Sequence, residues 1–234
     1  MLKQNRLFGL FFRTVSFALC LAGLVSICFR GGTFSPFLLL YYTTQSNILV
    51  LVYFAVVIIK TAIDIKKYGK TGSSSYFERL SAAFMIAISV TMLVFWTLLV
   101  PSAFVMRDGS GDLTAGAPSL FSFSNLQVHL ITPLLMIADY IMFSARGKLK
   151  KNDPFLFTLI PIAYLIQTTI IGFTSGITYG VDPITNKVLH FPYFFIDYYI
   201  SGPMVAVYVA VIAAFFVGVS YGILYLDRKY AKKI

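Results

Sequence analysis

The sequence predicts an all-α integral membrane protein, a six-transmembrane-helix bundle that forms a single domain over residues 1–234. Two compositional observations predict this class. Of the 234 residues 58% are hydrophobic and 17% aromatic, while 12% are charged, about half of the roughly 25% found in globular proteins. The mean hydropathy of +0.81 excludes a disordered chain, because disorder needs low hydrophobicity.

Six apolar runs along the chain are the third observation. About 20 residues cross a hydrocarbon core of ~30 Å, and each run reaches that length. The first run is too long for a signal-peptide core and has no clear cleavage site behind it, so we interpret it as a retained span. The spans are expected near residues 7–29, 37–60, 80–100, 121–143, 155–176 and 199–226.

The basic residues predict the orientation of these spans. The chain carries 19 Lys and Arg against 9 Asp and Glu, a net charge of +10. All but Arg30, Arg107 and Lys187 lie near the N-terminus, in the second-to-third and fourth-to-fifth loops, or in the tail. Because cytoplasmic loops carry the excess of Lys and Arg, we expect both termini in the cytoplasm and the chain in the plasma membrane. The charge then serves topology and contact with membrane lipids, and no nucleic-acid partner is expected.

Polar side chains recur within the expected spans. At ~1.5 Å of rise per residue, three spans place polar groups about 10–12 Å below the outer face of a ~30 Å core, and the sixth span begins just above them. Such groups usually face the bundle interior, so we expect a polar pocket in the outer half of the membrane. Its candidate members are Thr43, Thr44, Asn47, Asn125, His129, Gln167, Thr168 and Ser201.

One expected helix carries a histidine beside a proline. Asn125 and His129 are four residues apart and share a helix face. Pro133 has no N–H, so the carbonyl of His129 loses its helix donor and the helix should kink there. The kink and the polar groups together favour a pocket over plain helix packing.

A threonine and a histidine at matched depth suggest nucleophilic catalysis. His129 can take and return a proton near neutral pH, and the hydroxyl of Thr44 becomes a nucleophile when a base lies within hydrogen-bond reach. Asn47, Asn125, Gln167 or a main-chain amide could hold the imidazole or an oxyanion. The alternative is that these polar groups only bond helices together, and the spacing does not decide between the two.

Other chemistries find less support. The chain has two histidines, one of them in an outer loop, and two cysteines confined to the first span, so we expect no metal site and no cofactor. Arg13 and Asp139 both lie near the inner ends of their spans, and we expect them to form a structural ion pair.

Three stretches carry a resemblance to a known family: Tyr42-Thr43-Thr44-Gln45-Ser46-Asn47, His129-Leu-Ile-Thr-Pro133 continuing to Asp139-Tyr140, and Phe191-Pro192-Tyr193 with Asp197. The chain resembles a bacterial family of six-span membrane proteins that is distantly similar to the animal androgen-induced membrane proteins. Those are threonine hydrolases of fatty acid esters of hydroxy fatty acids. The resemblance implies Thr44 as nucleophile and His129 as its partner; the adjacent Thr43 leaves a register one residue earlier open.

The sequence therefore favours a membrane-embedded hydrolase of lipid esters, with Thr44 attacking the acyl carbon and His129 acting as base and then acid. The substrate would be lipid-like. The alternative is a lipid or small-molecule transporter or binding protein that uses the same pocket. A hydrolase needs direct contact between threonine and histidine, whereas a transporter does not. The oligomeric state is not predicted.

Overall fold

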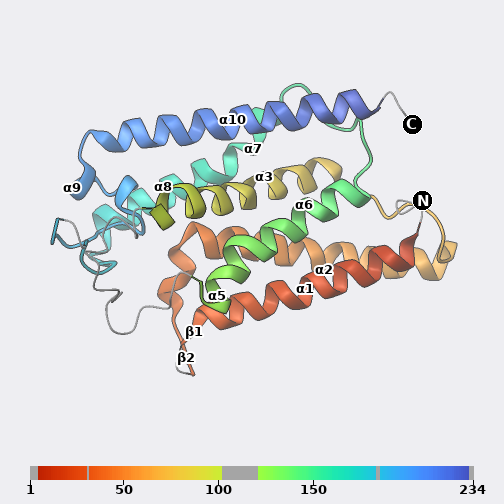
Figure 1. The fold of residues 1–234 in the computed structure, drawn as a ribbon, viewed down its shortest axis with the longest axis horizontal. Helices are drawn as coiled ribbons and strands as arrows, with labels where there is room; N and C mark the ends of the chain where they lie inside the picture. Colours follow the sequence, from red (N-terminus) through yellow and green to blue (C-terminus); the bar gives the residue numbers. More distant parts are fainter. Residues whose placement is uncertain (1–4, 31, 102–120, 183–184, 232–234) are drawn as a thin grey trace.

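The computed structural model describes residues 5–30, 32–101, 121–182 and 185–231, and six long helices run roughly side by side within them (Figure 1). Each of the six is long and apolar enough to cross a membrane, which confirms the expected number of spans. The chain is a helical, multi-pass membrane protein. The spans cover Arg6–Cys28, Tyr42–Tyr68, Glu78–Leu99, Phe123–Phe143, Asp153–Thr174 and Met204–Ala231.

Three spans consist of a single helix and three are divided. The single helices are α1 (Arg6–Cys28), α2 (Tyr42–Tyr68) and α10 (Met204–Ala231). The divided spans are α3 (Glu78–Val94) with the π-helical turn η3 (Phe95–Leu99); α5 (Phe123–Leu126), the π-helical turn η4 (Gln127–Ile131) and α6 (Thr132–Phe143); and α7 (Asp153–Phe157) with α8 (Leu159–Thr174). The short elements are the antiparallel strands β1 (Phe29–Arg30) and β2 (Thr33–Phe34), the 3-10 turns η2 (Pro36–Leu40) and η5 (Phe194–Ile196), and α9 (Tyr198–Ser201).

Two spans begin later than the sequence predicts. The second was expected from residue 37, but η2 occupies that stretch and Tyr41 is extended, with φ −84° and ψ 139°, so α2 begins at Tyr42. The sixth was expected from residue 199, where the short α9 ends at Gly202 with a φ of +51°. Glycine adopts this conformation at little cost, and the long helix α10 starts only at Met204.

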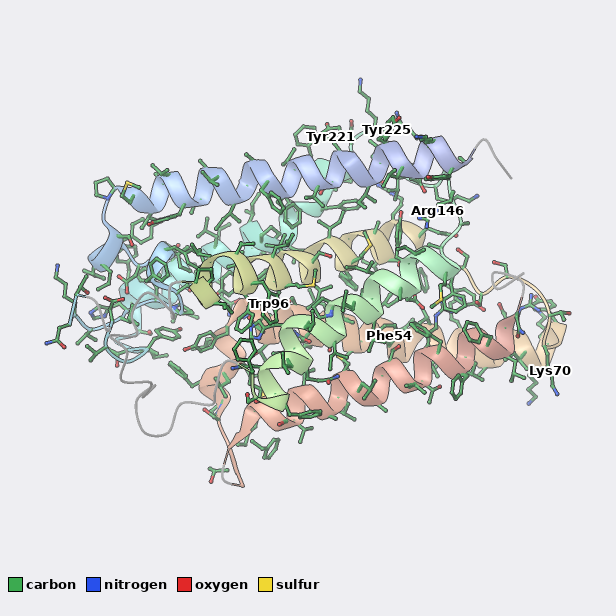
Figure 2. All side chains as sticks on the ribbon, viewed as in Figure 1. Phe54, Lys70, Trp96, Arg146, Tyr221 and Tyr225 are labelled. Atoms are coloured by element: carbon green, nitrogen blue, oxygen red, sulfur yellow. The ribbon has the colours of Figure 1, made fainter. Side chains whose placement is uncertain are left out.

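Helix α3 lies at the centre of the bundle, between α2 and α6 on one side and α7 and α10 on the other. The core that joins α1, α2, α3 and α6 is apolar, and Phe54, labelled in Figure 2, is fully buried within it. Helix α1 begins and α10 ends at the same end of the bundle, while η5 and α9 lie at the opposite end (Figure 1). We call these the terminal end and the loop end.

A buried ion pair cross-links the terminal end. Arg13 Nε of α1 lies 2.7 Å from Asp139 Oδ1 of α6, and the two side chains are 1% and 0% exposed. Arg13 also donates to the Ser74 carbonyl and to the Thr61 hydroxyl, at 2.9 and 3.2 Å, and the Tyr53 hydroxyl donates to Asp139 Oδ2 at 3.1 Å. The pair expected from the sequence is present, and further hydrogen bonds satisfy each charge, as burial requires.

Candidate active site

A threonine and a histidine from two different spans meet near the loop end of the bundle. Thr43 lies in the first turn of α2, and His129 lies in the middle of the π-helical turn η4. The Thr43 hydroxyl Oγ1 is 3.2 Å from the imidazole nitrogen Nε2 of His129, within hydrogen-bond distance. Both residues are buried. This is the contact between hydroxyl and base that nucleophilic catalysis needs.

The hydroxyl beside His129 is thus that of Thr43, whereas the sequence favoured Thr44. Successive residues of an α-helix point about 100° apart, so Thr43 and Thr44 cannot both face the imidazole. Thr44 is 1% exposed and does not line the apolar cavity described below, whereas Thr43 does. The geometry therefore fits the alternative register that the sequence left open.

The hydrogen bond at the other ring nitrogen determines which nitrogen of His129 carries the proton. Nδ1 lies 3.0 Å from the main-chain carbonyl oxygen of Asn125, which can only accept. Nδ1 therefore carries the hydrogen, and Nε2 presents a lone pair to Thr43. The ring also stacks on Phe95, with centroids 3.8 Å apart and planes 15° apart. The sequence offered the side chain of Asn125 for this role, and the structure uses its main chain.

Asn47 joins the two helices that carry the pair. Its Nδ2 donates to the carbonyl of Thr43 at 2.8 Å and to the carbonyl of Val128, the residue before His129, at 3.1 Å. Ser46 also donates to the Thr43 carbonyl at 3.0 Å and lies 2.8 Å from the hydroxyl of Thr91 on α3. These bonds fix the first turn of α2 against η4 and α3.

A tyrosine from the loop before η5 completes the surroundings of Thr43. The Tyr193 hydroxyl lies 3.4 Å from Thr43 Oγ1 and also accepts from the Thr43 N–H at 3.4 Å. Burial raises the pKa of Tyr193 above its usual value, so the hydroxyl keeps its proton. Phe191-Pro192-Tyr193 is one of the stretches that carry the family resemblance and is strongly aromatic, but nothing in its spacing indicates contact with α2.

Asp197 and Ser201 hold this tyrosine loop in place. The two carboxylate oxygens of Asp197 accept from four main-chain N–H groups, those of His190, Phe191, Tyr199 and Ile200. Ser201 Oγ donates to the carbonyl of Phe194 at 2.7 Å. Ser201, a candidate pocket residue, therefore supports the loop above the site.

The remaining candidates of the expected polar layer lie on α8, apart from the pair. Gln167 is exposed and accepts from Gln45 Nε2 at 3.2 Å, which links α8 to α2. Thr168 is buried, one turn after Tyr164 on the same helix. Neither lines the cavity next to Thr43.

Thr43 and Tyr193 form one end of an apolar cavity of about 320 Å³. The cavity lies between α3, α7, α8 and α10, and apart from three threonines and three tyrosines every lining side chain is hydrocarbon. Its lining extends from Leu165 on α8 to Phe155 on α7. These two residues are ten positions apart, or about 15 Å along the helix. Phe155 and Ile162 line the cavity and are also 57% and 46% exposed, so the cavity reaches the outer surface of the bundle.

The first turn of α2 adds positive potential at this end of the cavity. The N–H groups of Tyr42, Thr43 and Thr44 have no acceptor within their own helix, because a helix leaves its first donors unpaired. The 27-residue helix also directs the positive end of its dipole here. An anionic oxygen beside Thr43 would be stabilised by this field.

The fold and this site define a class, a six-span helical membrane protein with a buried threonine–histidine pair at one end of an apolar cavity. No protein-family model, curated protein or solved structure matches the chain. Over the described residues no group of three or more His, Cys, Asp or Glu side chains could hold a metal ion.

Proposed function

We propose that the chain is a membrane-embedded hydrolase of lipid (fatty acyl) esters in which Thr43 is the nucleophile and His129 the general base. The observation that carries the proposal is the 3.2 Å contact between Thr43 Oγ1 and His129 Nε2 at the end of an apolar cavity. The cavity volume of about 320 Å³ lies at the lower end of the roughly 300–1,000 Å³ of ligand pockets. Its hydrocarbon lining suits an acyl chain.

The reaction would proceed in two steps that use the same histidine. Thr43 Oγ1 attacks the ester carbonyl carbon while its proton passes to His129 Nε2. The oxyanion is stabilised by the Tyr193 hydroxyl and by the positive end of α2. His129 then gives the proton to the departing alcohol oxygen, leaving an acyl ester on Thr43. Water, deprotonated by His129, attacks the acyl carbon; the bond to Thr43 Oγ1 breaks, His129 returns the proton to that oxygen, and the fatty acid leaves.

The expected topology places this chemistry in one half of the bilayer. With both termini in the cytoplasm, as the basic residues predict, the loop end faces outward and Thr43 lies in the outer half of the plasma membrane. The substrate would enter from the surrounding lipid past Phe155 and Ile162, which line the cavity and are exposed. The reaction as written requires no cofactor.

A second candidate function uses the same cavity without chemistry. An apolar cavity that reaches the membrane-facing surface also suits a lipid-binding protein or transporter. In that case the bond between Thr43 and His129 only joins α2 to η4. A covalent intermediate separates the two candidates, because only the hydrolase forms one.

A lipophilic fluorophosphonate tests the proposal on the purified full-length protein. We expect one adduct, mapped to Thr43 by mass spectrometry, because the probe traps a nucleophile activated by a base. Thr43→Ala should abolish labelling, and His129→Gln should reduce it almost as much, since the pair acts as a unit. Thr44→Ala is the matched control and should leave most of the labelling.

Each variant is first shown to be folded by its thermal unfolding in detergent. If Thr44→Ala abolishes labelling and Thr43→Ala does not, the nucleophile is Thr44. Labelling that survives both threonine variants, or a folded wild type with neither adduct nor ester turnover, would leave the binding or transport function as the better one.

A further inference from the structure

A second hollow lies at the terminal end of α10, far from the Thr43 site. It is an open groove of about 540 Å³ between α10 and the segment that precedes α7. Three cations from these two elements line it, Lys151, Arg228 and Lys229, and the other lining residues are Tyr221, Leu224 and Tyr225. We call it the basic groove.

No acidic side chain neutralises these cations within the described part of the groove. Asp227, on the same helix, is 1% exposed and accepts from the Leu149 N–H at 3.1 Å, so its carboxylate points into the protein. Asp153, two residues after Lys151, is fully buried and paired with Arg79. The groove therefore presents net positive charge.

The basic groove lies where a membrane surface is expected. Helix α10 has 28 residues and is about 42 Å long, more than the ~30 Å hydrocarbon core. Its last turn carries Arg228 and Lys229, so we expect this end to extend into the headgroup region. Tyr221 and Tyr225, labelled along the terminal half of α10 in Figure 2, are the type of residue found at that interface. The ammonium of Lys229 lies 5.7 Å from the Tyr225 ring centre.

Apolar surface continues from the groove toward the bilayer centre. Ala213, Val217, Tyr221, Tyr225 and Lys229 follow at four-residue intervals and form a row that is inclined to the axis of α10. The first two line the apolar cavity and the last three line the basic groove. A molecule with a charged head in the groove would therefore have a hydrocarbon tail that runs past Tyr221 toward Val217.

The groove lies far from Thr43, although Val217 of the cavity and Tyr221 of the groove are one turn apart on α10. Val209 lines the cavity, and Arg228 lies 19 residues further along α10, about 28 Å away. The esters of a lipid lie next to its headgroup, so a lipid held in the groove has them far from Thr43. Its role differs from that of a substrate.

We propose that the basic groove binds the phosphate headgroup of an anionic phospholipid from the leaflet around the terminal end of α10. Lys151, Arg228 and Lys229 pair with the phosphate, and Tyr221 and Tyr225 pack against the glycerol and the upper chains. Basic pockets between transmembrane helices on the cytoplasmic side bind anionic headgroups in other membrane proteins, and the cations of this groove come from two separate elements.

The test uses the delipidated full-length protein in a neutral detergent, with thermal unfolding as the readout, because a ligand that binds only the folded state raises the unfolding temperature. The probes are dihexanoyl phosphatidylglycerol, dihexanoyl phosphatidylcholine and glycerol phosphate. We expect phosphatidylglycerol alone to stabilise the protein, and added salt to weaken the effect. Each cation near an anionic surface contributes on the order of fivefold in affinity, so a variant lacking all three should bind on the order of 100-fold more weakly.

That variant carries Lys151→Gln, Arg228→Gln and Lys229→Gln. The matched control carries Lys66→Gln, Lys67→Gln and Lys70→Gln, three exposed cations near the end of α2, where Lys67 also lies 5.0 Å from the ring centre of Tyr68. The control should bind phosphatidylglycerol like the wild type. Lys151→Gln alone, in an exposed loop position, should cost about fivefold and serves if the triple variant does not fold.

Several results would overturn the proposal. Equal stabilisation of the wild type and the groove variants would show that the groove is not the site. If the groove variant and the control variant lose equal affinity for phosphatidylglycerol, binding depends only on the net charge of the protein and not on the groove. Stabilisation by glycerol phosphate to the same extent would exclude a lipid as the occupant, and no response to phosphatidylglycerol would exclude the site altogether.

Discussion

The indole nitrogen of Trp96 donates to the main-chain carbonyl of His129 at 3.3 Å. Pro133 has no N–H and cannot donate to this carbonyl, four residues earlier, or to that of Val128, five residues earlier. Asn47 donates to the Val128 carbonyl at 3.1 Å. Two side chains, those of Trp96 and Asn47, therefore donate to the carbonyls that Pro133 leaves without a donor. They stabilise the π-helical turn that carries the imidazole.

Replacing the donor should destabilise the turn. Trp96→Phe leaves the His129 carbonyl without the indole, and we expect the free energy of unfolding to fall by about 1–3 kcal/mol. Denaturant unfolding in detergent, followed by circular dichroism, measures this loss. Tryptophan fluorescence cannot be used, because Trp96 is the sole tryptophan of the sequence. In a Pro133→Ala background residue 133 regains an N–H, so the loss should be smaller. An equal loss in both backgrounds would show that the indole of Trp96 does not compensate for the missing N–H of Pro133.

A larger side chain in the cavity should change the preferred acyl length if the hydrolase proposal holds. Ala213 lines the cavity, and the neighbouring Ala214 does not. Ala213→Phe should reduce turnover of long-chain p-nitrophenyl esters at least tenfold while sparing short-chain esters, because the added ring occupies part of the acyl space. Ala214→Phe should keep the wild-type preference. Equal effects of the two substitutions would place the acyl chain elsewhere.

The buried ion pair should show coupled stability effects. Arg13→Gln or Asp139→Asn leaves one buried charge without its partner, which costs about 3–5 kcal/mol. The double variant carries no unpaired charge and should recover part of the loss. Denaturant unfolding of the four proteins in detergent gives the coupling energy. Strictly additive losses would mean that the contact contributes nothing beyond the two separate sites.

The helices were predictable from sequence, and the direction of the side chains was not. Bilayer thickness sets the span length, so apolar runs locate all six spans. The same arithmetic cannot separate Thr43 from Thr44, which differ by 1.5 Å in depth but by about 100° in direction. Which of them faces His129 depends on where α2 begins and on the turn η4, and both depend on tertiary contacts, including those of Asn47.

The orientation in the membrane is a prediction from the basic residues alone. Lys148 precedes α7 at the terminal end, and Lys187 precedes η5 at the loop end; both are exposed. In a background with Cys20→Ala and Cys28→Ala, an impermeant thiol reagent applied to intact cells should label Lys187→Cys and not Lys148→Cys. Labelling of position 148 alone would reverse the orientation and move Thr43 to the inner half of the bilayer.

The Tyr193 hydroxyl should contribute directly to the proposed reaction. It lies 3.4 Å from Thr43 Oγ1, and burial raises its pKa, so at neutral pH it is protonated and can donate to an oxyanion. Removing one such donor slows acyl transfer about 10²–10³-fold, and we expect Tyr193→Phe to reduce ester turnover by this factor with little change in folding. Tyr179→Phe is the control, because Tyr179 belongs to the same aromatic loop region and packs on Phe37 and Tyr41. If the two variants retain equal turnover, Tyr193 only covers the site, and the oxyanion must be stabilised by the first turn of α2.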